Sequence, residues 1–270
     1  MPELPEVETT RLGLLPRLQG RALTRIVVRN PRLRWPIPND LEARLKGQTL
    51  QGLSRRGKYL LFNFGPLTQI VHLGMSGSLR FTEPGEPAAL HDHVDWQFDD
   101  GTTLRLRDPR RFGAVLWTDD VSSHPLLAHL GPEPLTPEFD AAYLHAQCQR
   151  RSAAIKQVIM DAQMVVGVGN IYASESLFHA GIRPTTAAQR LSRPACARLV
   201  AAIKQVLTAA IAAGGSSLRD YVHSSGELGY FQLQTRVYDR AGLPCKTCAT
   251  PIRRIVQGQR ASFYCPGCQA

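Results

Sequence analysis

Apolar and polar side chains alternate along the first half of the chain, with turn residues at short intervals. Eight short runs show this alternation or a continuous apolar stretch: residues 22–28, 48–54, 59–64, 69–74, 78–81, 94–98, 102–107 and 114–117. Short strands at this spacing predict a β-sandwich. Pro5, followed by Glu6 and Glu8, is typical of the first turn of a helix and predicts a short helix before the strands.

The pattern changes after residue 117. Residues 118–137 are rich in Pro, Ser and Gly and predict a linker that contains a short helix. Thr136, followed by Pro137 and Glu138, is a helix start signal. Helical spacing of apolar residues then covers 137–149, 153–160, 171–180 and 193–213, and Gly214-Gly215 is an end signal. We therefore expect an α+β multidomain protein, with an N-terminal β-sandwich over residues 1–121, a linker over 122–135, a helical domain over 136–235 and a small unit over 236–270.

Four cysteines in the small unit form two close pairs with the spacing C-x2-C-x16-C-x2-C: Cys245, Cys248, Cys265 and Cys268. This spacing is typical of a four-thiolate zinc site. Residues 252–264 alternate like a β-hairpin, which would bring both pairs to one ion. We expect one structural Zn²⁺ per chain, because four thiolates leave no open coordination position. Two chance pairs or a redox C-x-x-C motif are the alternatives. Cys148 and Cys196 are expected to be packed in the interior.

The charge balance is strongly basic. The chain has 32 Lys and Arg against 22 Asp and Glu, a formal net charge of +10. This balance favours a polyanionic partner such as nucleic acid, with a simple solubility preference as the alternative. Six basic residues and one acid lie within 236–270, which suits phosphate contact or a solvated surface.

The sequence favours a cytoplasmic protein without a membrane segment. The start of the chain is acidic and interrupted by proline, and it has no apolar core of a signal peptide. The apolar segment 199–213 carries Lys204 and is shorter than a bilayer span. In a reducing compartment the six cysteines favour metal binding or chance occurrence over disulfides.

Two further segments carry candidate chemistry. Removal of Met1 would leave Pro2 with a free secondary amine beside the carboxylate of Glu3. An α-amino group has a reference pKa of about 7.7–8.0, so a fraction of the Pro2 amine is unprotonated and can act as a nucleophile that forms an iminium. The alternative, which this stretch alone favours, is that PELPE merely begins a helix. Residues 165–175 contain Gly167 and Gly169 before Asn170 at a helix start, which suits phosphate contact or a tight helix connection.

These pieces together resemble the formamidopyrimidine-DNA glycosylase family. The matching segments are PELPEVE at the start, GK at 57–58, HLGMSG at 72–77, HDHVD at 91–95, DPRRFG at 108–113, GVGNIYASE at 167–175 and the four-cysteine finger. They occur in family order along essentially the whole chain. The resemblance implies a helix–two-turn–helix in the helical domain, a β-hairpin zinc finger and a monomer that binds damaged double-stranded DNA at the nucleoid.

The resemblance also implies roles for individual residues. Pro2 would be the nucleophile and Glu3 the acid/base, while Lys58 and Arg260 would assist elimination. His91, Arg110, Arg151 and Asn170 would contact DNA. Met75, Arg110 and Phe112 would insert into the duplex, where apolar, flat and forked side chains can wedge between bases. The loop over 216–232 would read the base, and Arg219 stands there where the family more often has lysine.

The predicted activity is base-excision repair of oxidised purines, namely 8-oxoguanine and formamidopyrimidines. Removal of the base would be followed by strand cleavage through β- and δ-elimination. One alternative is a glycosylase for oxidised pyrimidines. Another is a non-catalytic zinc-ribbon module that senses damaged DNA, although binding alone requires neither Pro2, Glu3 nor Lys58.

Overall fold

The computed structural model describes residues 2–215 and 235–270. The chain divides into two compact units. One consists of Met1–Ala128 with Ala213–Tyr230, and the other of His129–Ala212 with Phe231–Ala270. Each unit has its own secondary structure and is described separately below.

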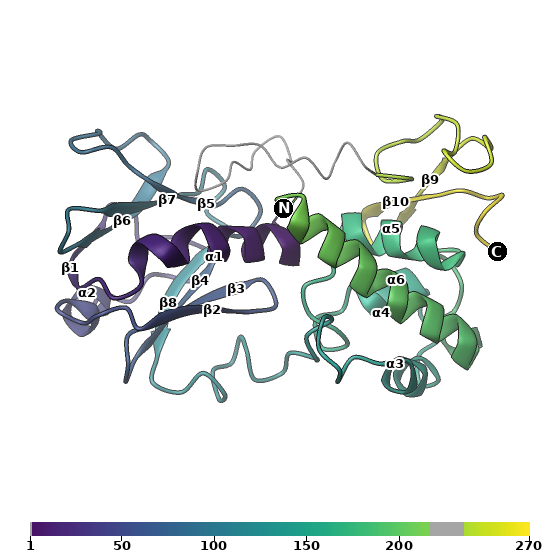
Figure 1. Cartoon of the computed structure of the whole chain (residues 1–270), viewed down its shortest axis with the longest axis horizontal. Coiled ribbons are helices and arrows are strands. Elements are labelled where there is room, and N and C mark those ends of the chain that lie inside the picture. Colours follow the sequence, from purple (N-terminus) through teal and green to yellow (C-terminus); the bar gives the residue numbers. More distant parts are fainter. Residues whose placement is uncertain (1, 216–234) are drawn as a thin grey trace. The chain divides into compact units, whose positions relative to one another are not determined.

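The first unit is a β-sandwich preceded by a helix, as predicted (Figure 1). Its elements are α1 (Leu4–Leu18), β1 (Leu23–Val28), α2 (Leu41–Leu45), β2 (Gly52–Arg56), β3 (Tyr59–Asn63), β4 (Thr68–His72), β5 (Ser78–Phe81), β6 (Asp92–Phe98), β7 (Thr103–Arg107) and β8 (Ala114–Thr118). One sheet has the order β1-β6-β7-β5 and the other β2-β3-β4-β8. All neighbouring strands are antiparallel.

Strand periodicity explains the core of this unit. Leu60 and Phe62 alternate with Leu61 on β3 and both join the core between the sheets. The Phe62 ring stacks on Trp96 from the opposite sheet, with centroids 6.5 Å apart. α1 packs against β2 and β3 and adds Val7, Leu14 and Leu18 to this core.

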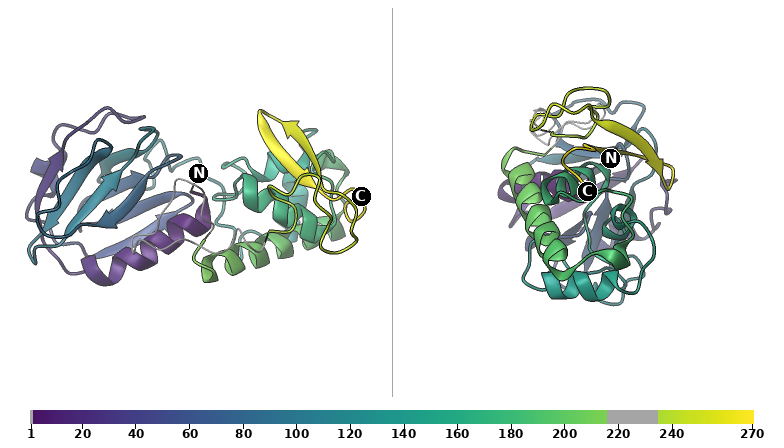
Figure 2. Two further views of the ribbon diagram at one scale, coloured as in Figure 1. Left: turned by 90° about the horizontal axis from the view of Figure 1, so that it is seen from above. Right: turned by 90° about the vertical axis from the view of Figure 1, so that its right-hand side faces the viewer.

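The second unit combines helices with a β-hairpin (Figure 2). It contains α3 (Ala141–Cys148), α4 (Ile155–Ile159), α5 (Asn170–Ala180), the 3-10 helix η1 (Ala188–Arg190), α6 (Arg193–Ala212), β9 (Arg253–Gln257) and β10 (Arg260–Tyr264). α6 packs against α3 and α5, and β10 packs against α5. Cys148 on α3 and Cys196 on α6 are buried, as predicted.

The structure corrects the predicted elements between the sandwich and α3. Residues 119–140 contain turns and no helix, so the predicted short helix is wrong. α3 begins at Ala141 rather than after Thr136, because the Asp140 carboxylate accepts the Tyr143 N–H at 2.7 Å and caps the helix. Helix α2, which follows Asp40 and buries Leu41 and Leu45, was not predicted.

Helix α6 has 20 residues and is long and apolar enough, by length and composition alone, to cross a membrane. The expectation that this apolar segment is shorter than a bilayer span is therefore wrong, because residues 199–213 cover only part of the helix. Its buried residues recur every three or four positions, for example Leu199, Ile203, Val206 and Ala210. This is the pattern of a helix that packs on one side against a protein core.

Candidate functional site

Pro2 and Glu3 lie immediately before α1, and both are buried. The backbone N–H of Glu3 donates to Oε2 of Glu6 at 2.7 Å, and Glu6 is itself fully buried. Gly215 lies directly beside this carboxylate, because a Cβ added at Gly215 would be 3.1 Å from Glu6 Oε1. The backbone that carries the predicted nucleophile and acid/base is therefore fixed by a buried carboxylate.

Lys58 occupies the two-residue turn between β2 and β3. Arg55 connects this turn to α1, because its Nη1 donates to the Gly57 carbonyl and its Nε to Glu8 Oε2, both at 2.9 Å. Burial alone would raise the pKa of Glu8, but hydrogen bonds from Arg11 and Arg55 outweigh it and lower the pKa. The Lys58 turn is thus tied to the helix that follows Pro2 and Glu3.

His72, at the end of β4, is a residue that the sequence reasoning did not single out. Burial, with Lys58 and Arg34 nearby, lowers the pKa of His72 to about 4. The neutral ring accepts the Gly74 N–H at Nδ1 (3.0 Å), so its hydrogen lies on Nε2. His72 is the first residue of the HLGMSG motif, but only the fold shows that its ring is buried and neutral.

The three predicted insertion residues lie on two adjoining loops. Met75 follows β4 and is 37% exposed, whereas Phe112 precedes β8 and is 42% exposed. The Arg110 guanidinium carbon lies 4.9 Å from the Phe112 ring centroid. Gly74 is required here, because a Cβ would lie 2.4 Å from the backbone carbon of Phe112. The structure thus brings the loops of all three residues together.

A cavity of about 660 Å³ adjoins these loops. It is lined by Arg32, Arg34, Arg110, Arg111 and Phe112. Four guanidinium groups, with no carboxylate among the described residues of the lining, favour an anionic ligand such as a phosphate backbone. Arg32 and Arg34 were not predicted, although the basic run at 29–34 was a signal.

His91 lies before β6, close in sequence to the buried His93, and the two rings are 6.5 Å apart. Its carbonyl accepts the Asp108 N–H at 3.0 Å. The predicted DNA contact at His91 therefore adjoins the loop that carries Arg110.

In the second unit, Lys156, which was not predicted, links Asn170 to the strand that begins with Arg260. The buried Lys156 Nζ donates to Asn170 Oδ1 (2.7 Å), Ser262 Oγ (2.7 Å) and the Ala261 carbonyl (3.0 Å). Asn170 is the first residue of α5, and Arg260 begins β10 directly after the hairpin turn. Arg260 and Lys156 line one cavity of about 200 Å³.

Arg151 lies after α3, and its Nη1 donates to both the carbonyl and the side chain of Gln147. This predicted DNA contact is therefore anchored to the end of α3. The predicted base-reading loop over 216–232, with Arg219, lies outside the described residues.

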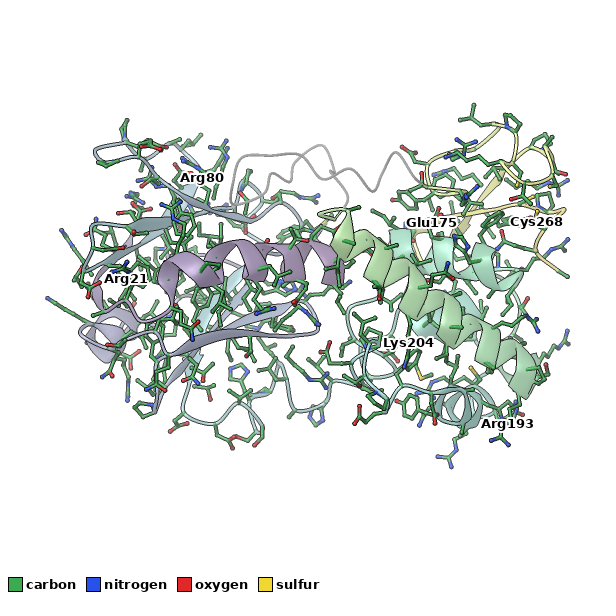
Figure 3. All side chains as sticks on the ribbon, in the orientation of Figure 1. Arg21, Arg80, Glu175, Arg193, Lys204 and Cys268 are labelled. Carbon is green, nitrogen blue, oxygen red and sulfur yellow. The ribbon has the colours of Figure 1, made fainter. Side chains whose placement is uncertain are left out.

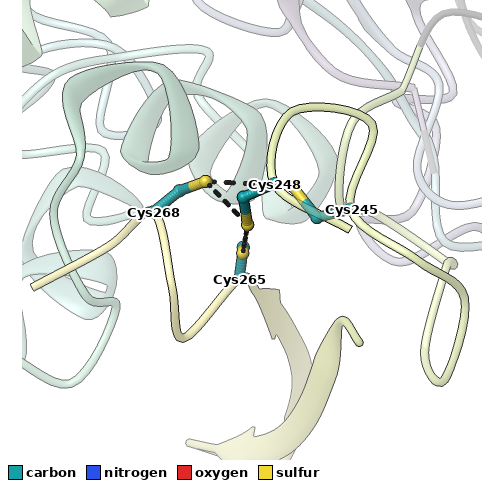
Figure 4. Close-up of side chains that lie close together, drawn as sticks. All are labelled: Cys245, Cys248, Cys265 and Cys268. Atoms are coloured by element: carbon teal, nitrogen blue, oxygen red, sulfur yellow. Dashed lines mark hydrogen bonds between the residues drawn. The ribbon is translucent and has the colours of Figure 1, made fainter. Parts of the chain in front are cut away.

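The four C-terminal cysteines form a site suited to one zinc ion (Figure 4). Their sulfur atoms all lie within 4.8 Å of one another, with separations of 3.3, 3.4 and 3.9 Å for three of the pairs. A tetrahedral ion with Zn–S distances of about 2.3 Å places its ligands about 3.8 Å apart. The sulfur positions and the four-thiolate donor set both fit zinc.

The finger shares its core with α5. Phe178 of that helix packs with Val237, Ile252 and Phe263. Glu175, which is labelled in Figure 3 and lies one turn earlier, accepts the backbone N–H groups of Arg236, Val237 and Tyr238 at 2.8, 3.0 and 2.8 Å. The zinc site is thus built onto the helix that begins with Asn170.

Comparisons with known proteins agree with this arrangement. Three family models match: the formamidopyrimidine-DNA glycosylase N-terminal domain over residues 1–115, its H2TH domain over 130–222, and a zinc finger found in FPG and IleRS over 242–270. The chain is similar to formamidopyrimidine-DNA glycosylases of Thiobacillus denitrificans (80% identity) and Bordetella petrii (59%), with 100% of this chain and at least 99% of each relative covered.

Solved structures show the same fold. The MutM (Fpg) protein of Thermus thermophilus aligns with a TM-score of 0.90 at 38% identity, covering 99% of this chain and 98% of that one. A Lactococcus lactis Fpg mutant in complex with DNA containing Fapy-dG aligns with a TM-score of 0.92 at 35% identity, covering 99% of both chains. The predicted fold class and zinc finger are therefore confirmed, and the chain belongs to the formamidopyrimidine-DNA glycosylase family.

Proposed function

We propose that this protein is a base-excision repair enzyme that removes oxidised purines from double-stranded DNA and then cleaves the strand. The observation that carries the proposal lies in the first unit. In that unit Glu6 fixes the backbone of Pro2 and Glu3, and Arg55 ties the Lys58 turn to α1. The same unit carries the exposed side chains of Met75 and Phe112, which together with Arg110 we call the wedge. The related L. lactis protein, crystallised with Fapy-dG DNA, supports the substrate class.

The chemistry begins with the Pro2 amine once Met1 has been removed. Its lone pair attacks C1′ of the damaged nucleotide, and the glycosidic bond breaks as the base leaves with a proton. Glu3 protonates the ring oxygen O4′, so the sugar opens and an iminium joins Pro2 to C1′. The iminium acts as an electron sink, which allows loss of a proton from C2′.

Strand cleavage follows from the same intermediate. Loss of the C2′ proton expels the 3′ phosphate, and a second elimination expels the 5′ phosphate. Lys58 supplies or removes protons in these steps, and Arg260 stabilises the phosphate charge that develops. Hydrolysis of the remaining adduct returns Pro2 as a free amine.

The wedge supports extrusion of the damaged base, which costs a few kcal/mol of unstacking. Met75, Arg110 and Phe112 fill the space that the base leaves and kink the duplex. Arg110 can donate to O2 and N3 of an unpaired cytosine, whereas adenine presents a donor there. Excision of oxidised guanine opposite cytosine restores the correct pair, so this selectivity suits repair.

Other residues hold the DNA backbone. We propose that His91, Arg151 and Asn170 contact phosphates, with Arg32 and Arg34 beside the wedge. The zinc ion, when bound, is structural and fixes the hairpin that carries Arg260. In this proposal the chain has four parts: a catalytic domain over 1–121, a linker over 122–135, a DNA-binding domain over 136–235 and the zinc finger over 236–270. We expect the protein to act as a monomer. Because its substrate is chromosomal DNA, we expect it in the cytoplasm, at the nucleoid.

Borohydride trapping on duplexes that carry single defined lesions tests the proposal. Reduction of the iminium should leave protein covalently attached to 8-oxoguanine and formamidopyrimidine duplexes, with the adduct on residue 2 by mass spectrometry. Preferential trapping on oxidised pyrimidines would favour the alternative glycosylase. No adduct on any duplex, with binding retained, would favour the damage-sensing module. An adduct on Lys58 alone would refute the Pro2 mechanism.

A further inference from the structure

The two insertion loops are joined by one buried side chain, Asp108. This residue is 0% exposed, and each carboxylate oxygen has its own donor. Oδ1 accepts the Ser76 hydroxyl at 3.1 Å, which belongs to the Met75 loop. Oδ2 accepts the Gly113 N–H at 2.8 Å, which ends the Arg110–Phe112 loop. Asp108 therefore links both loops through its two oxygens.

Ser76 completes a closed chain of hydrogen bonds between the loops. Its Oγ donates to Asp108 and also accepts the Arg110 N–H at 3.3 Å. The backbone contacts are equally close, since a Cβ on Gly113 would lie 2.7 Å from the His72 carbonyl. With main chain packed on main chain, neither loop can shift without the other.

The backbone between Arg110 and Phe112 adopts a strained conformation. Arg111 has φ = 57°, in the left-handed region that non-glycine residues seldom adopt. Its N–H donates to the Asp108 carbonyl at 3.1 Å, and the same carbonyl accepts His93 Nε2 at 2.9 Å. Such strain persists where the surroundings hold it, and it is frequent at functional sites. Asp108 thus anchors the loop through its backbone and its side chain.

We propose that Asp108 is a positioning residue that makes the two loops one rigid wedge, so that Met75, Arg110 and Phe112 enter the duplex together. The inference rests on the proposed function. A buried carboxylate touches neither DNA nor the reacting atoms, so Asp108 acts through the loops it joins. Its loss should impair insertion and opposite-base selectivity while the chemistry at Pro2 remains.

The test compares Asp108→Ala with Asp108→Asn, Ser76→Ala and the exposed control Asp119→Ala. Insertion is followed by 2-aminopurine fluorescence next to a lesion in a duplex. Chemistry is followed by borohydride trapping on a single-stranded abasic oligonucleotide, which requires no insertion. Hydrogen bonds to a charged group are strong enough that Asp108→Ala should slow insertion about tenfold or more. Trapping on the single strand should stay within about twofold of wild type.

The remaining variants separate positioning from a general loss of structure. In Asp108→Asn the amide oxygen can still accept the Gly113 N–H, and the amide NH₂ can donate to the Ser76 hydroxyl. This variant should therefore recover much of the insertion rate that Asp108→Ala loses. Ser76→Ala cuts one link and should narrow the cytosine/adenine selectivity, with thermal melting showing that the unit is folded. Asp119→Ala should match wild type.

Two results distinguish a failure of the proposed function from a failure of the role proposed for Asp108. If the wild type gives no trapped adduct, the proposed function fails. If the wild type traps normally and folded Ser76→Ala and Asp108→Ala insert at its rate and with its selectivity, the function stands and the coupling role of Asp108 is refuted.

Discussion

Replacement of Lys156 by Met should loosen the arrangement of Asn170 and Arg260. The substitution keeps the length and apolar stem of the side chain but removes three hydrogen bonds of 2.7, 2.7 and 3.0 Å from a nearly fully buried ammonium group. The carbonyl of Ala261 keeps the Asn170 Nδ2 donor at 3.0 Å. Asn170 Oδ1 loses its charged donor, while the Ser262 hydroxyl can rotate.

The expected change in the free energy of unfolding is the balance of two effects. Hydrogen bonds from a charged donor contribute about 1.5–3 kcal/mol each, which gives a gross loss of about 4.5–9 kcal/mol. Removal of a buried ammonium group returns several kcal/mol of desolvation cost. We expect a net destabilisation of about 2 kcal/mol, a fall in Tm of about 8 °C for a unit of this size, and about tenfold weaker DNA binding.

The assay combines thermal unfolding with fluorescence anisotropy on an abasic duplex at two salt concentrations. All three ammonium hydrogens are directed to protein acceptors, so the salt dependence of binding should not change. Lys204→Met is the matched control, because Lys204 donates one hydrogen bond, to the Thr136 carbonyl at 2.8 Å, from α6 (labelled in Figure 3). If both variants lose stability and DNA affinity equally, the reasoning about Lys156 is wrong.

Four further outcomes follow from the contacts described above. Freshly purified protein should contain one zinc per chain, and chelation should lower the melting temperature of the second unit, because the finger shares a core with Phe178. Glu8→Gln should cost about 1 kcal/mol of stability at pH 7, because the amide weakens the hydrogen bonds from Arg11 and Arg55. Since the folded pKa of Glu8 is lowered, urea titrations should show this difference above the usual carboxylate pKa and lose it as pH falls through the folded pKa. Gln69→Met should leave stability unchanged or raise it by about 1 kcal/mol in chemical denaturation, because both amide atoms are buried without a partner among the described residues. Arg110→Ala should narrow the cytosine/adenine ratio in single-turnover cleavage by about 5- to 150-fold, and retention of the full ratio by this variant but not by Arg111→Ala would show that the wrong arginine was assigned.

The strands could be predicted because each is short, alternates with a two-residue period and ends at a turn. All eight predicted runs overlap an observed strand, and the largest error is at β2, which begins at Gly52. Residues 48–50 hydrogen-bond to residues 20–23 and form a single bridge there, Ala22–Thr49, instead of a strand. The start of α3 was misplaced because Pro137 and Glu138 also suit an ordinary turn, and the cap is supplied by Asp140. Local signals alone do not decide between two nearby caps.

The positioning residues could not be predicted, because their partners are distant in sequence. Lys156 meets Ser262 across 106 positions, and Asp108 meets Ser76 across 32. Lys156 alone suggests a solvated helix face, and Asp108 alone suggests a turn. The candidate DNA contacts were easier to nominate because they lie in short motifs, whereas the residues that hold them become visible only in the fold.

Three buried carboxylates hold backbone segments that carry proposed functional residues. Glu6 accepts the Glu3 N–H, Asp108 joins the insertion loops, and Glu175 accepts three N–H groups at the start of the finger. Each of these acids is at most 1% exposed and serves a segment that carries a proposed functional residue. Because their partners are mainly backbone N–H groups, they do not neutralise nearby arginines. Replacement of one of these acids by alanine therefore removes an anchor and not a DNA contact, so it should reduce catalysis or insertion while the salt dependence of DNA binding stays the same.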